Sequence, residues 1–520
     1  MKIYTLDLET DPFVKDRKPE PFSAGLYDGE RFWFTWGPTC VDDIFTVIHR
    51  IEPGIIYMHN GGKFDIFYML HKIDTSKDML IIKDRIVQCW VATYGGHHRL
   101  RDSYKILPFS LSTYKKDEID YHKLESNVRE NYKDEIVSYL RGDCVYLWEL
   151  CTEYVKMFGP AVTIGATAMK ELKKRHDVGE MLTGVIDSEI RTKYFLGGRV
   201  ERFKKGVFNG VWKVYDVNSM YPYVMSHCFH PVGKPRSVTT HVTPDTYFVT
   251  ARGFSRGAFP LRTKQGLQYA HSHGVYSITI HEWNTAHELG LFDCHEILEC
   301  VNFDQSRMFH DYVMHYYNSR KHAKETGDKI KDIFFKFLLN NSYGKFAVNP
   351  ANFKEYRLTE DTIDLSVESY VPEEIIPDFH LILWSKPSKE FKYANVATGA
   401  SITGAARAVL MRGLSGAVNP IYCDTDSIIC EELTGVTLDE STLGGWKLEK
   451  TGNLLAIAGR KMYALWDGER CVKYACKGVK IDPTEIRRAA EGETITYHRD
   501  APTFRLSGSV DWITRRVRTV

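Results

Sequence analysis

Residues 421–428 read Ile-Tyr-Cys-Asp-Thr-Asp-Ser-Ile, an apolar stretch that carries two acids, Asp424 and Asp426, at a spacing of two. In a continuous strand this spacing places both side chains on one face, but the polar Thr-Asp-Ser favours a hairpin turn that projects the acids together. Two carboxylates at a hairpin tip can hold a divalent metal ion. An isolated Asp-x-Asp is more often a solvated turn, because surface turns favour Asp, Ser and Thr.

Two stretches upstream favour the metal site over the solvated turn. Residues 214–222 read Val-Tyr-Asp-Val-Asn-Ser-Met-Tyr-Pro, which predicts a short apolar strand that ends at Asp216, with Pro222 as its breaker. Residues 335–344 read Phe-Lys-Phe-Leu-Leu-Asn-Asn-Ser-Tyr-Gly. Three side chains recur there at i, i+4 and i+7, which predicts one shared helical face: Lys336, Asn340 and Tyr343.

In this order the three stretches resemble the A, B and C motifs of family-B DNA polymerases: Asp-x-x-Ser-hydrophobic-Tyr-Pro, Lys-x-x-x-Asn-x-x-Tyr-Gly and Tyr-x-Asp-Thr-Asp-Ser. One such match is weak evidence, whereas three ordered matches are strong. The resemblance implies nucleotidyl transfer, in which two divalent ions stabilise the attacking and leaving oxygens, and Mg²⁺ prefers carboxylate ligands. The implied catalytic residues are Asp216, Asp424 and Asp426, and these three with Val217 are the implied metal ligands.

The same resemblance implies nucleotide- and DNA-binding residues. Lys336 is expected to meet the incoming triphosphate, where its charge stabilises the charge that develops on the leaving pyrophosphate. Tyr221 is expected to pack beneath the sugar and exclude a 2′-hydroxyl, the group that distinguishes RNA from DNA. The other implied nucleotide-binding residues are Ser219, Lys324, Asn340 and Tyr343, and the implied DNA-binding residues are Thr425, Lys461 and Tyr463.

A second set of acids lies in the first third of the chain. Residues 1–12 predict a strand in which an Asp and a Glu alternate with leucines and share one face. Residues 55–65 predict a strand followed by paired glycines, which permit a tight turn that returns an Asp towards the first strand. Residues 134–156 have a helical pattern that places a Tyr and an Asp on one face. These residues are Asp7, Glu9, Asp65, Tyr139 and Asp143.

Their order resembles the three motifs of the proofreading 3′-5′ exonuclease found in the same polymerases. The resemblance implies two-metal hydrolysis, with water as nucleophile and the 3′-terminal phosphodiester as target. The family's Ser-Leu segment reads Ser103-Tyr104 here, and Ser110-Leu111 is a rival placement. The implied residues are Asp7, Glu9, Asp65 and Asp143 as catalytic metal ligands, Tyr139 and Lys116 as further catalytic groups, and Asn60 as a contact to the terminal nucleotide.

Residues 194–200, Tyr-Phe-Leu-Gly-Gly-Arg-Val, resemble the Tyr-x-Gly-Gly loop that joins the two activities and guides the DNA strand between them. The aligned aromatic is Phe195, which keeps a stacking surface but has no hydroxyl. We therefore expect strand transfer between the two sites to persist in weakened form. The implied DNA-binding residues of this loop are Phe195, Gly197 and Gly198.

The length of 520 residues predicts roughly three domains. The expected fold class is α/β and α+β multidomain, with a ribonuclease-H-like exonuclease domain and a right-hand polymerase of palm, fingers and thumb that carries two insertions. The expected division is 1–190 for the exonuclease domain, 191–227 and 391–493 for the palm, 228–311 for a first insertion that contacts a terminal protein, 312–350 for the fingers, 351–390 for a second insertion that forms a strand-displacement hairpin, and 494–520 for the thumb.

The amino-acid composition is compatible with an enzyme that acts on nucleic acid but does not by itself indicate one. A hydrophobic content of 43% and a charged content of 26% are ordinary for a globular protein, and the net charge of +1 allows acidic metal sites to cancel basic grooves. The 11 cysteines form no Cys-x-x-Cys pair, so neither a zinc knuckle nor a disulfide framework is predicted. We see no secretory signal and no apolar run of membrane-spanning length. His281 and His287 are six residues apart, too far round a helix for the His-Glu-x-x-His zinc motif.

We therefore expect a DNA-dependent DNA polymerase that extends a 3′-hydroxyl from a terminal-protein primer, with proofreading and strand displacement. The expected cofactors are two Mg²⁺ ions at each site, with Mn²⁺ as a substitute. The expected partners are template/primer DNA, deoxynucleoside triphosphates and a terminal protein; we expect no membrane contact, a monomer, and a location in a host cytoplasm or an organelle matrix. The alternatives are a polymerase that uses nucleic-acid primers only, a DNA-binding exonuclease without polymerase activity, and a non-catalytic replication scaffold.

Overall fold

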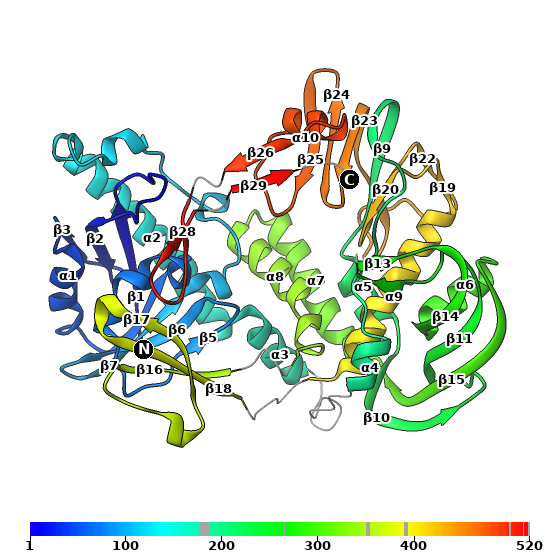
Figure 1. Ribbon diagram of the computed structural model, residues 1–520, viewed down its shortest axis with the longest axis horizontal. Helices are drawn as coiled ribbons and strands as arrows, with labels where there is room; N and C mark the ends of the chain where they lie inside the picture. Colours follow the sequence, from blue (N-terminus) through cyan, green and yellow to red (C-terminus); the bar gives the residue numbers. More distant parts are fainter. Residues whose placement is uncertain are drawn as a thin grey trace.

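Two seven-stranded sheets, one near each side of the molecule, organise the chain (Figure 1). The structure is a computed structural model in which residues 1–175, 188–264, 266–349, 354–388, 394–498, 501–512 and 514–517 are described. Two helices, α7 (His310–Glu325) and α8 (Lys329–Asn341), lie between the two sheets in Figure 1.

The first sheet is built from the N-terminal residues and has the strand order β3-β2-β1-β4-β7-β6-β5. Strand β1 is parallel to the central strand β4, and β4 is parallel to β7, while the outer strands are antiparallel. Helix α2 packs against β1 and β2. The elements are β1 (Lys2–Thr10), β2 (Pro21–Tyr27), β3 (Phe32–Trp36), α1 (Cys40–Ile48), β4 (Gly54–Met58), β5 (Leu80–Ile81), β6 (Ile86–Thr93), β7 (Gly96–Asp102) and α2 (Lys133–Phe158).

Short 3-10 turns connect β4, β7 and α2. The turn after β4 begins at Asn60, whose φ of 63° is left-handed, so the reversal is made one residue before the glycines that the sequence analysis credited with it. A Cβ on Gly62 would lie 1.8 Å from the carbonyl oxygen of Ile86, so space is what requires glycine there. The turns are η1 (Gly61–Lys63), η2 (Asp65–Tyr68), η3 (Leu70–Lys72), η4 (Ser103–Lys105), η5 (Leu111–Thr113), η6 (Tyr121–Leu124) and η7 (Arg129–Tyr132).

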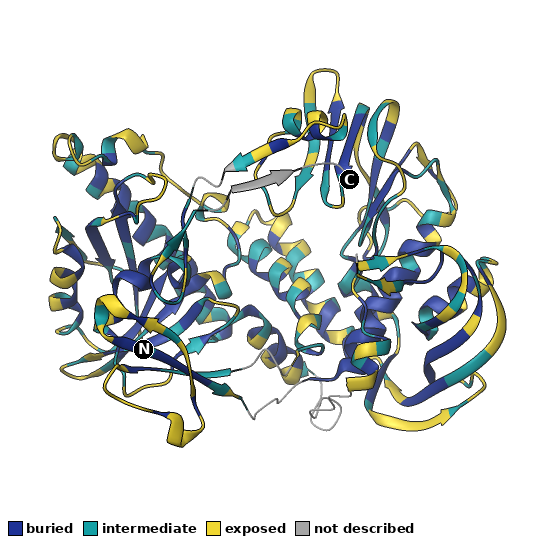
Figure 2. Ribbon diagram, viewed as in Figure 1, coloured by how far each residue is buried: buried dark blue, intermediate teal, exposed yellow. Residues whose placement is uncertain are grey.

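The second sheet has the order β25-β24-β23-β9-β21-β20-β8. Helix α9 is rich in Ala and Gly, is buried along most of its length and contacts α5 and β21, because small side chains allow close approach (Figure 2). The elements are β8 (Val200–Arg202), β9 (Gly206–Val217), α5 (Met220–His227), α9 (Val396–Ser415), β20 (Tyr422–Asp424), β21 (Ser427–Cys430), β23 (Trp446–Gly459), β24 (Met462–Asp467), β25 (Arg470–Cys476) and α10 (Pro483–Ala490), with the small pair β19 (Ala417–Val418) and β22 (Glu432–Leu433) alongside.

Helices α7 and α8 pack against α3 (Ile164–Arg175), and a single apolar cluster joins them to the N-terminal sheet and to the second sheet. The rings of Phe109 and Phe337 stack at 5.5 Å across this junction. Helix α8 ends at Asn341, and Tyr343 begins the short turn η8 (Tyr343–Lys345), so the predicted single helical face extends over Lys336 and Asn340 but not Tyr343.

Between β9 and α7 the chain forms a four-stranded sheet of order β10-β15-β11-β14, with α6 beside it. These elements are β10 (His230–Thr239), β11 (Thr246–Arg256), β14 (His271–Thr279), α6 (Ile280–Glu288) and β15 (Phe292–Ser306), and the small hairpin β12 (Leu261–Thr263) and β13 (Gly266–Gln268) projects from them. Before β8, α4 (Ser188–Lys193) packs against α9, and Ile190 is buried with Tyr194 and Phe248.

The segment after α8 forms a three-stranded antiparallel sheet of order β16-β18-β17, in which β17 and β18 make a hairpin and β16 adds a third strand. Its buried Leu358 and Leu383 join the core of the N-terminal sheet. The elements are β16 (Lys354–Glu360), η10 (Ser366–Glu368), β17 (Val371–Ile376), η11 (Pro377–Phe379) and β18 (Leu381–Pro387). The expected domain limits at 350/351 and 390/391 lie outside the described residues.

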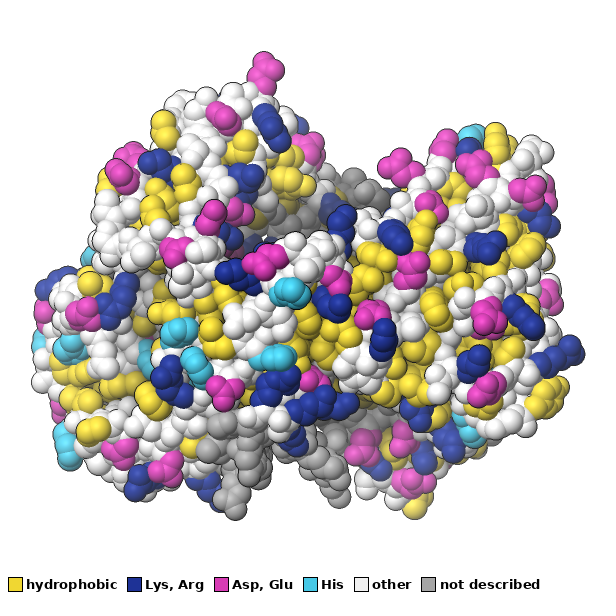
Figure 3. Space-filling view, turned by 180° about the vertical axis from the view of Figure 1, so that it is seen from behind, with side chains coloured by type: hydrophobic (Ala, Val, Ile, Leu, Met, Phe, Trp, Pro, Cys, Tyr) yellow, Lys and Arg dark blue, Asp and Glu magenta, His cyan; other side chains and the backbone are white. Residues whose placement is uncertain are grey.

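The last part of the chain makes two short antiparallel pairs, β26 (Ile495–His498) with β29 (Thr514–Val517) and β27 (Thr503–Phe504) with β28 (Val510–Asp511). The second pair lies against the N-terminal sheet (Figure 1). From behind, the molecule is hollowed between its two upper parts, and basic side chains are interspersed with acidic ones (Figure 3). No helix in the described ranges is both long and apolar enough to cross a membrane.

Candidate active sites

The Asp-Thr-Asp sequence forms the tip of the hairpin between β20 and β21. Thr425 adopts a left-handed conformation with φ 59°, and its N–H donates to the carbonyl of Arg199 at 2.7 Å. Asp216 ends β9 directly opposite Ser427 of β21. The Val217 N–H donates to the carbonyl of Asp426 at 2.8 Å, which ties the two segments together. The structure therefore brings Asp216, Asp424 and Asp426 to one edge of the second sheet.

These three carboxylates lie in a partly desolvated site. Burial raises the pKa of Asp426 to about 7, and the nearby charge of Asp216 adds to the rise. Burial also raises the pKa of Asp216, an effect that the positive charge of Lys447 opposes. The Lys461 Nζ lies 2.6 and 2.7 Å from the two carboxylate oxygens of Asp424. Each ion pair offsets part of the repulsion among the acids.

The residues expected to bind the nucleotide lie on α5, α7, α8 and η8 or directly before α5. The rings of Tyr221 and Tyr343 stack at 4.3 Å between centroids, with 13° between their planes. Ser219 begins α5 with a left-handed φ of 54°. Lys336 and Asn340 are exposed on α8, and Lys324 is on α7. Tyr463 is buried on β24, with its ring 5.2 Å from Tyr422, the residue two places before Asp424.

The loop after α4 abuts the Asp-Thr-Asp hairpin. A Cβ on Gly198 would lie 2.8 Å from Thr425 Oγ1, whereas a Cβ on Gly197 would meet nothing within 4 Å. Phe195 is half-buried, and its carbonyl accepts a hydrogen bond from Arg262 at 3.2 Å. Of the two glycines, therefore, only Gly198 is required by its contact with the hairpin.

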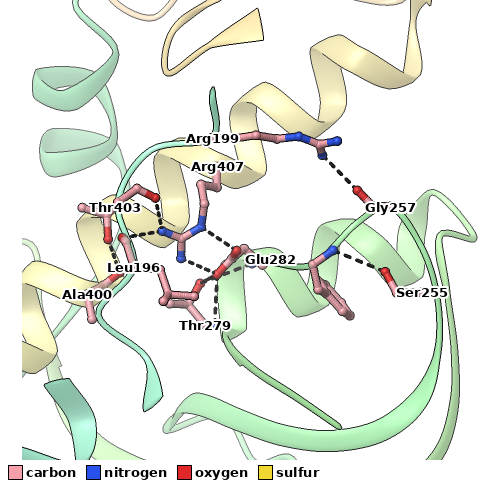
Figure 4. A network of polar contacts seen from close by, with 11 residues as sticks. Leu196, Arg199, Ser255, Gly257, Thr279, Glu282, Ala400, Thr403 and Arg407 are labelled. Carbon is pink, nitrogen blue, oxygen red and sulfur yellow. Dashed lines mark hydrogen bonds and ion pairs between the residues drawn. The ribbon is translucent and has the colours of Figure 1, made fainter. Parts of the chain in front are cut away.

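The buried ion pair of Arg407 and Glu282 anchors the backbone of this loop (Figure 4). Arg407 of α9 donates from Nε and Nη2 to the two carboxylate oxygens of Glu282 at 2.7 and 2.9 Å, and from Nη1 to the carbonyls of Leu196 and Gly197 at 2.6 and 2.8 Å. Burial alone would lower the pKa of Arg407, but Glu282 raises it above its ordinary value. The sequence analysis missed this pair, because nothing local links a Glu of α6 with an Arg 125 positions later.

Four acids converge in the N-terminal sheet: Asp7 and Glu9 on β1, Asp65 on η2 and Asp143 on α2. Burial raises the pKa of Asp7 well above its ordinary value, and the other three carboxylates add to the rise. Burial raises the pKa of Glu9 to about 8 and that of Asp65 to about 7. Burial also raises the pKa of Asp143, which Lys116 and the Tyr139 hydroxyl oppose.

Two of these acids, Asp7 and Asp65, line a cavity of about 480 Å³. Asn60 and Arg85 also line it, and so do Ala501 to Phe504 from the C-terminal part of the chain. Phe504 is 2% exposed and stacks on Phe67 at 5.3 Å. The sequence analysis placed residues 494–520 in a thumb and did not foresee this contact, for which no local signal exists. Tyr104 lies beside this cavity, with the Arg85 guanidinium 4.8 Å from its ring.

Both acidic clusters have the chemistry of a divalent-cation site, since all their donors are hard oxygen ligands. In the N-terminal cluster, Asp143 Oδ1 is buried without a hydrogen-bond partner, as an atom reserved for a cation would be. Across the described chain, no three His, Cys, Asp or Glu side chains already stand in the arrangement that holds an ion. At the second sheet the carboxylates are not arranged around an ion because Lys447 and Lys461 form ion pairs with Asp216 and Asp424.

Comparison with known proteins agrees with this geometry. Residues 112–435 match the family model for type B DNA polymerases, organellar and viral. The DNA-directed DNA polymerase of Enterobacteria phage PRD1 is 42% identical, over 99% of this chain and 98% of that protein. The DNA polymerase of Bacillus phage phi29 is 26% identical, over 89% of this chain and 86% of that protein.

A solved structure of phi29 DNA polymerase, complexed with primer-template DNA and incoming nucleotide substrates, matches with a TM-score of 0.76 at 19% identity, and the match covers 100% of both chains. This likeness confirms the expected fold, an exonuclease domain joined to a right-hand polymerase. The fold and the sequence similarity define a DNA-directed DNA polymerase with an exonuclease-type domain. The chain belongs to the type B DNA polymerases of the organellar and viral group.

Proposed function

We propose that this DNA polymerase extends a 3′-hydroxyl at the site formed by Asp216, Asp424 and Asp426. One observation carries the proposal: Asp216 and the Asp-Thr-Asp hairpin are about 200 residues apart in sequence, yet β9 and β21 pair so that Asp216 faces Ser427. Burial raises the pKa of Asp426 to about 7, and the charges of Asp216 and Asp424 add to the rise, as expected for acids gathered at one edge.

The surrounding residues support the binding of a deoxynucleotide. The stacked rings of Tyr221 and Tyr343 form a flat apolar surface at the site, suited to a sugar and a base pair. Lys336 and Lys324 carry positive charge on the two helices of the fingers. Lys461 and Tyr463 approach the hairpin from β24 and the turn before it, where a primer terminus would lie.

Type B polymerases generally use divalent metal ions, and we propose Mg²⁺ at both acidic clusters, two ions at each. Asp216, Asp424, Asp426 and the main chain of Val217 would hold the ions at the polymerase site, and Asp7, Glu9, Asp65 and Asp143 at the other. When bound, Mg²⁺ supplies charge stabilisation of the attacking and leaving oxygens. Lys461 and Lys447 form ion pairs with Asp424 and Asp216, and the charge of Lys447 opposes the rise that burial causes in the pKa of Asp216.

We propose that the N-terminal cluster removes mispaired 3′ nucleotides. Asp7 and Asp65 line a cavity large enough for a nucleotide, Glu9 and Asp143 lie within electrostatic range of Asp7, and Asn60 at the cavity wall supports recognition of the terminal residue. Tyr139 lies one helical turn from Asp143, where its hydroxyl can orient a water molecule. The Lys116 ammonium lies 5.8 Å from the Tyr139 ring, and it lowers the pKa of Asp7.

The partners are template/primer DNA, deoxynucleoside triphosphates and a terminal protein that supplies the first hydroxyl, and the enzyme works as a monomer in the cytoplasm of a host cell. Similarity to phage polymerases supports this proposal. The sheet of 228–311, inserted between β9 and the fingers, offers a surface for the priming protein. Incubation with candidate partner proteins and radioactive nucleotide tests priming by a terminal protein. We expect a covalently labelled protein, and the absence of labelling would favour the alternative, a polymerase that uses nucleic-acid primers only.

Primer extension with Mg²⁺ tests the polymerase site. Asp426→Ala should abolish extension and leave 3′-5′ degradation intact, while Asp143→Ala should do the reverse. Unchanged extension by Asp426→Ala would reject the polymerase assignment, and unchanged degradation by Asp143→Ala would reject the nuclease assignment. The two variants are matched controls for each other, because each keeps the other site's carboxylates.

A further inference from the structure

Lys447 is a cation at the polymerase site to which the sequence analysis assigned no role. It is the second residue of β23 and the direct partner of Asp216 in the pairing of β23 with β9. Its Nζ lies 3.2 Å from Asp216 Oδ1, and its side chain is 34% exposed. The ammonium group is therefore held by one carboxylate while it remains open to the solvent of the site.

The fingers present their own cations to the same region. Lys324 on α7 has a pKa lowered first by burial and then by the positive charges of Arg320, Lys336 and Lys447. Such mutual influence requires these cations to be close together, since screening in water suppresses the interaction at longer range. Arg320 is paired with Asp332 at 2.8 Å. Lys447 thus extends a cluster of finger cations down to the palm carboxylate Asp216.

A cluster of converging cations is unfavourable by itself and becomes favourable around a polyanion. A triphosphate has this character, and its β- and γ-phosphates become a free pyrophosphate during the reaction. Lysine is suited to the task, because its ammonium is a compact charge with three donors on a flexible stem that can move between neighbouring anions. Asp216 is one such anion, and a phosphate beside the metal site is another.

We propose that Lys447 binds the triphosphate of the incoming nucleotide and the departing pyrophosphate, and that Asp216 holds it ready beforehand. With Asp216 engaged by a divalent ion, the Lys447 ammonium is released towards the phosphates. In the reaction the 3′-hydroxyl oxygen bonds to the α-phosphorus, the bond to the α,β-bridging oxygen breaks, pyrophosphate leaves with that electron pair, and the hydroxyl proton passes to water. Lys447 keeps its protons and stabilises the charge on the leaving group.

This inference rests on the proposed polymerase site. It differs from a purely local role, in which Lys447 only neutralises Asp216. A local role affects every nucleotide alike, whereas a phosphate contact affects a triphosphate more than a diphosphate. Lys450 is a matched control, because it is an exposed lysine of the same strand whose register partner is Val214 instead of Asp216.

The experiment compares Lys447→Met, Lys447→Arg and Lys450→Met. The equilibrium affinities of dNTP and dNDP are measured for the enzyme on a dideoxy-terminated primer–template with Mg²⁺, and the KM for dNTP is measured on an extendable primer. Lys447→Met should weaken dNTP binding roughly ten- to hundredfold, the usual effect of losing a charged hydrogen bond, and should reduce the preference for dNTP over dNDP. Lys447→Arg should keep most of the affinity, and Lys450→Met should match the parent.

Unchanged dNTP affinity in Lys447→Met, or equal losses for dNTP and dNDP, would overturn the inference. Thermal unfolding of the same variants shows whether each one is folded. If Lys447→Met is unfolded, Lys447→Arg decides the question. A dNTP affinity like the parent's supports the contact, and an affinity reduced equally for dNTP and dNDP refutes it. Asp426→Ala separates the two proposals, because normal extension by that variant would reject the polymerase site itself, whereas lost extension with a normal Lys447→Met would reject the lysine contact alone.

Discussion

Arg407 and Glu282 form a two-point ion pair, 2.7 Å from Nε to Oε1 and 2.9 Å from Nη2 to Oε2, and their side chains are only 2% and 0% exposed. The pair joins the long helix α9 to α6, the helix beside the four-stranded sheet, and anchors the carbonyls of Leu196 and Gly197. The geometry of the loop beside the Asp-Thr-Asp hairpin therefore depends on a residue of α6.

Glu282→Gln should lower the free energy of unfolding by roughly 3–5 kcal/mol, because it leaves a buried guanidinium without a counter-charge. Chemical denaturation measures this. The exposed pair of Arg412 and Glu288 is a matched control, and Glu288→Gln should leave the melting temperature nearly unchanged. The double variant Glu282→Met/Arg407→Met should recover part of the lost stability but little of the extension activity. Equal stability of Glu282→Gln and the parent would contradict this role.

Gly198→Ala should reduce extension strongly, by about tenfold or more, because its Cβ would lie 2.8 Å from Thr425 Oγ1 and displace the tip that carries Asp424 and Asp426. Gly197→Ala introduces the same methyl group where nothing lies within 4 Å, so it is the internal control. Steady-state extension and thermal unfolding of both variants check this. A Gly197→Ala enzyme as impaired as Gly198→Ala would mean that flexibility, and not contact with Thr425, is what the loop requires.

The acids of the N-terminal cluster should make the metal-free protein less stable as the pH rises. Burial raises the pKa of Glu9 from 4.5 to about 8 and that of Asp65 from 3.8 to about 7. Between these limits the folded state retains protons that the unfolded state has released, so the free energy of unfolding falls as the pH increases from about 4.5 to about 8. The check is the melting temperature in a chelator across this range.

Glu9→Gln should flatten that pH dependence, and added Mg²⁺ should raise the melting temperature more at pH 8 than at pH 5, since a cation binds the ionised carboxylates. The comparison of variant with parent removes the contribution of all other titrating groups. A parallel pH profile for Glu9→Gln would show that this cluster ionises as freely in the folded state as in the unfolded one.

Phe504→Ala should loosen the C-terminal pair β27–β28 from the exonuclease domain. The ring is 2% exposed and packs against Phe64, Phe67 and Tyr68, so truncation costs about 3–5 kcal/mol of docking free energy. Limited proteolysis should then cut this segment sooner. Truncation of the exposed Phe229 provides the control, and equal cleavage rates would show that the segment is held by other contacts.

The motif acids could be predicted from the sequence because each lies within a short pattern, although the convergence that the pairing of β9 with β21 produces was expected only from the family resemblance. The helices α2 and α8 follow from local periodicity. Tyr343 does not share the predicted helical face with Lys336 and Asn340 because α8 ends two residues before it, at Asn341, and the i, i+7 spacing gives no sign of that helix end.

Contacts between distant segments could not be predicted. The docking of β16 and β18 on the N-terminal core depends on contacts of Leu358 and Leu383 with residues some 300 positions earlier in the chain. The local sequence around a leucine in a short strand does not indicate which distant segment it packs against. The same holds for Lys447, whose relation to Asp216 exists only through strand register, and for Glu282, which the sequence presented as part of a failed zinc motif.

The placement of Phe504 against residues 64–68 has a consequence for how the protein is made. On the ribosome, all four acids of the N-terminal cluster are present once 143 residues have been made. Ala501 to Phe504, which form one wall of the cavity lined by Asp7 and Asp65, are synthesised only with the final twentieth of the polypeptide. Contacts of such long sequence separation form late in folding. A chain that ends before these residues therefore lacks one wall of the cavity, which is completed only after the second sheet has been synthesised.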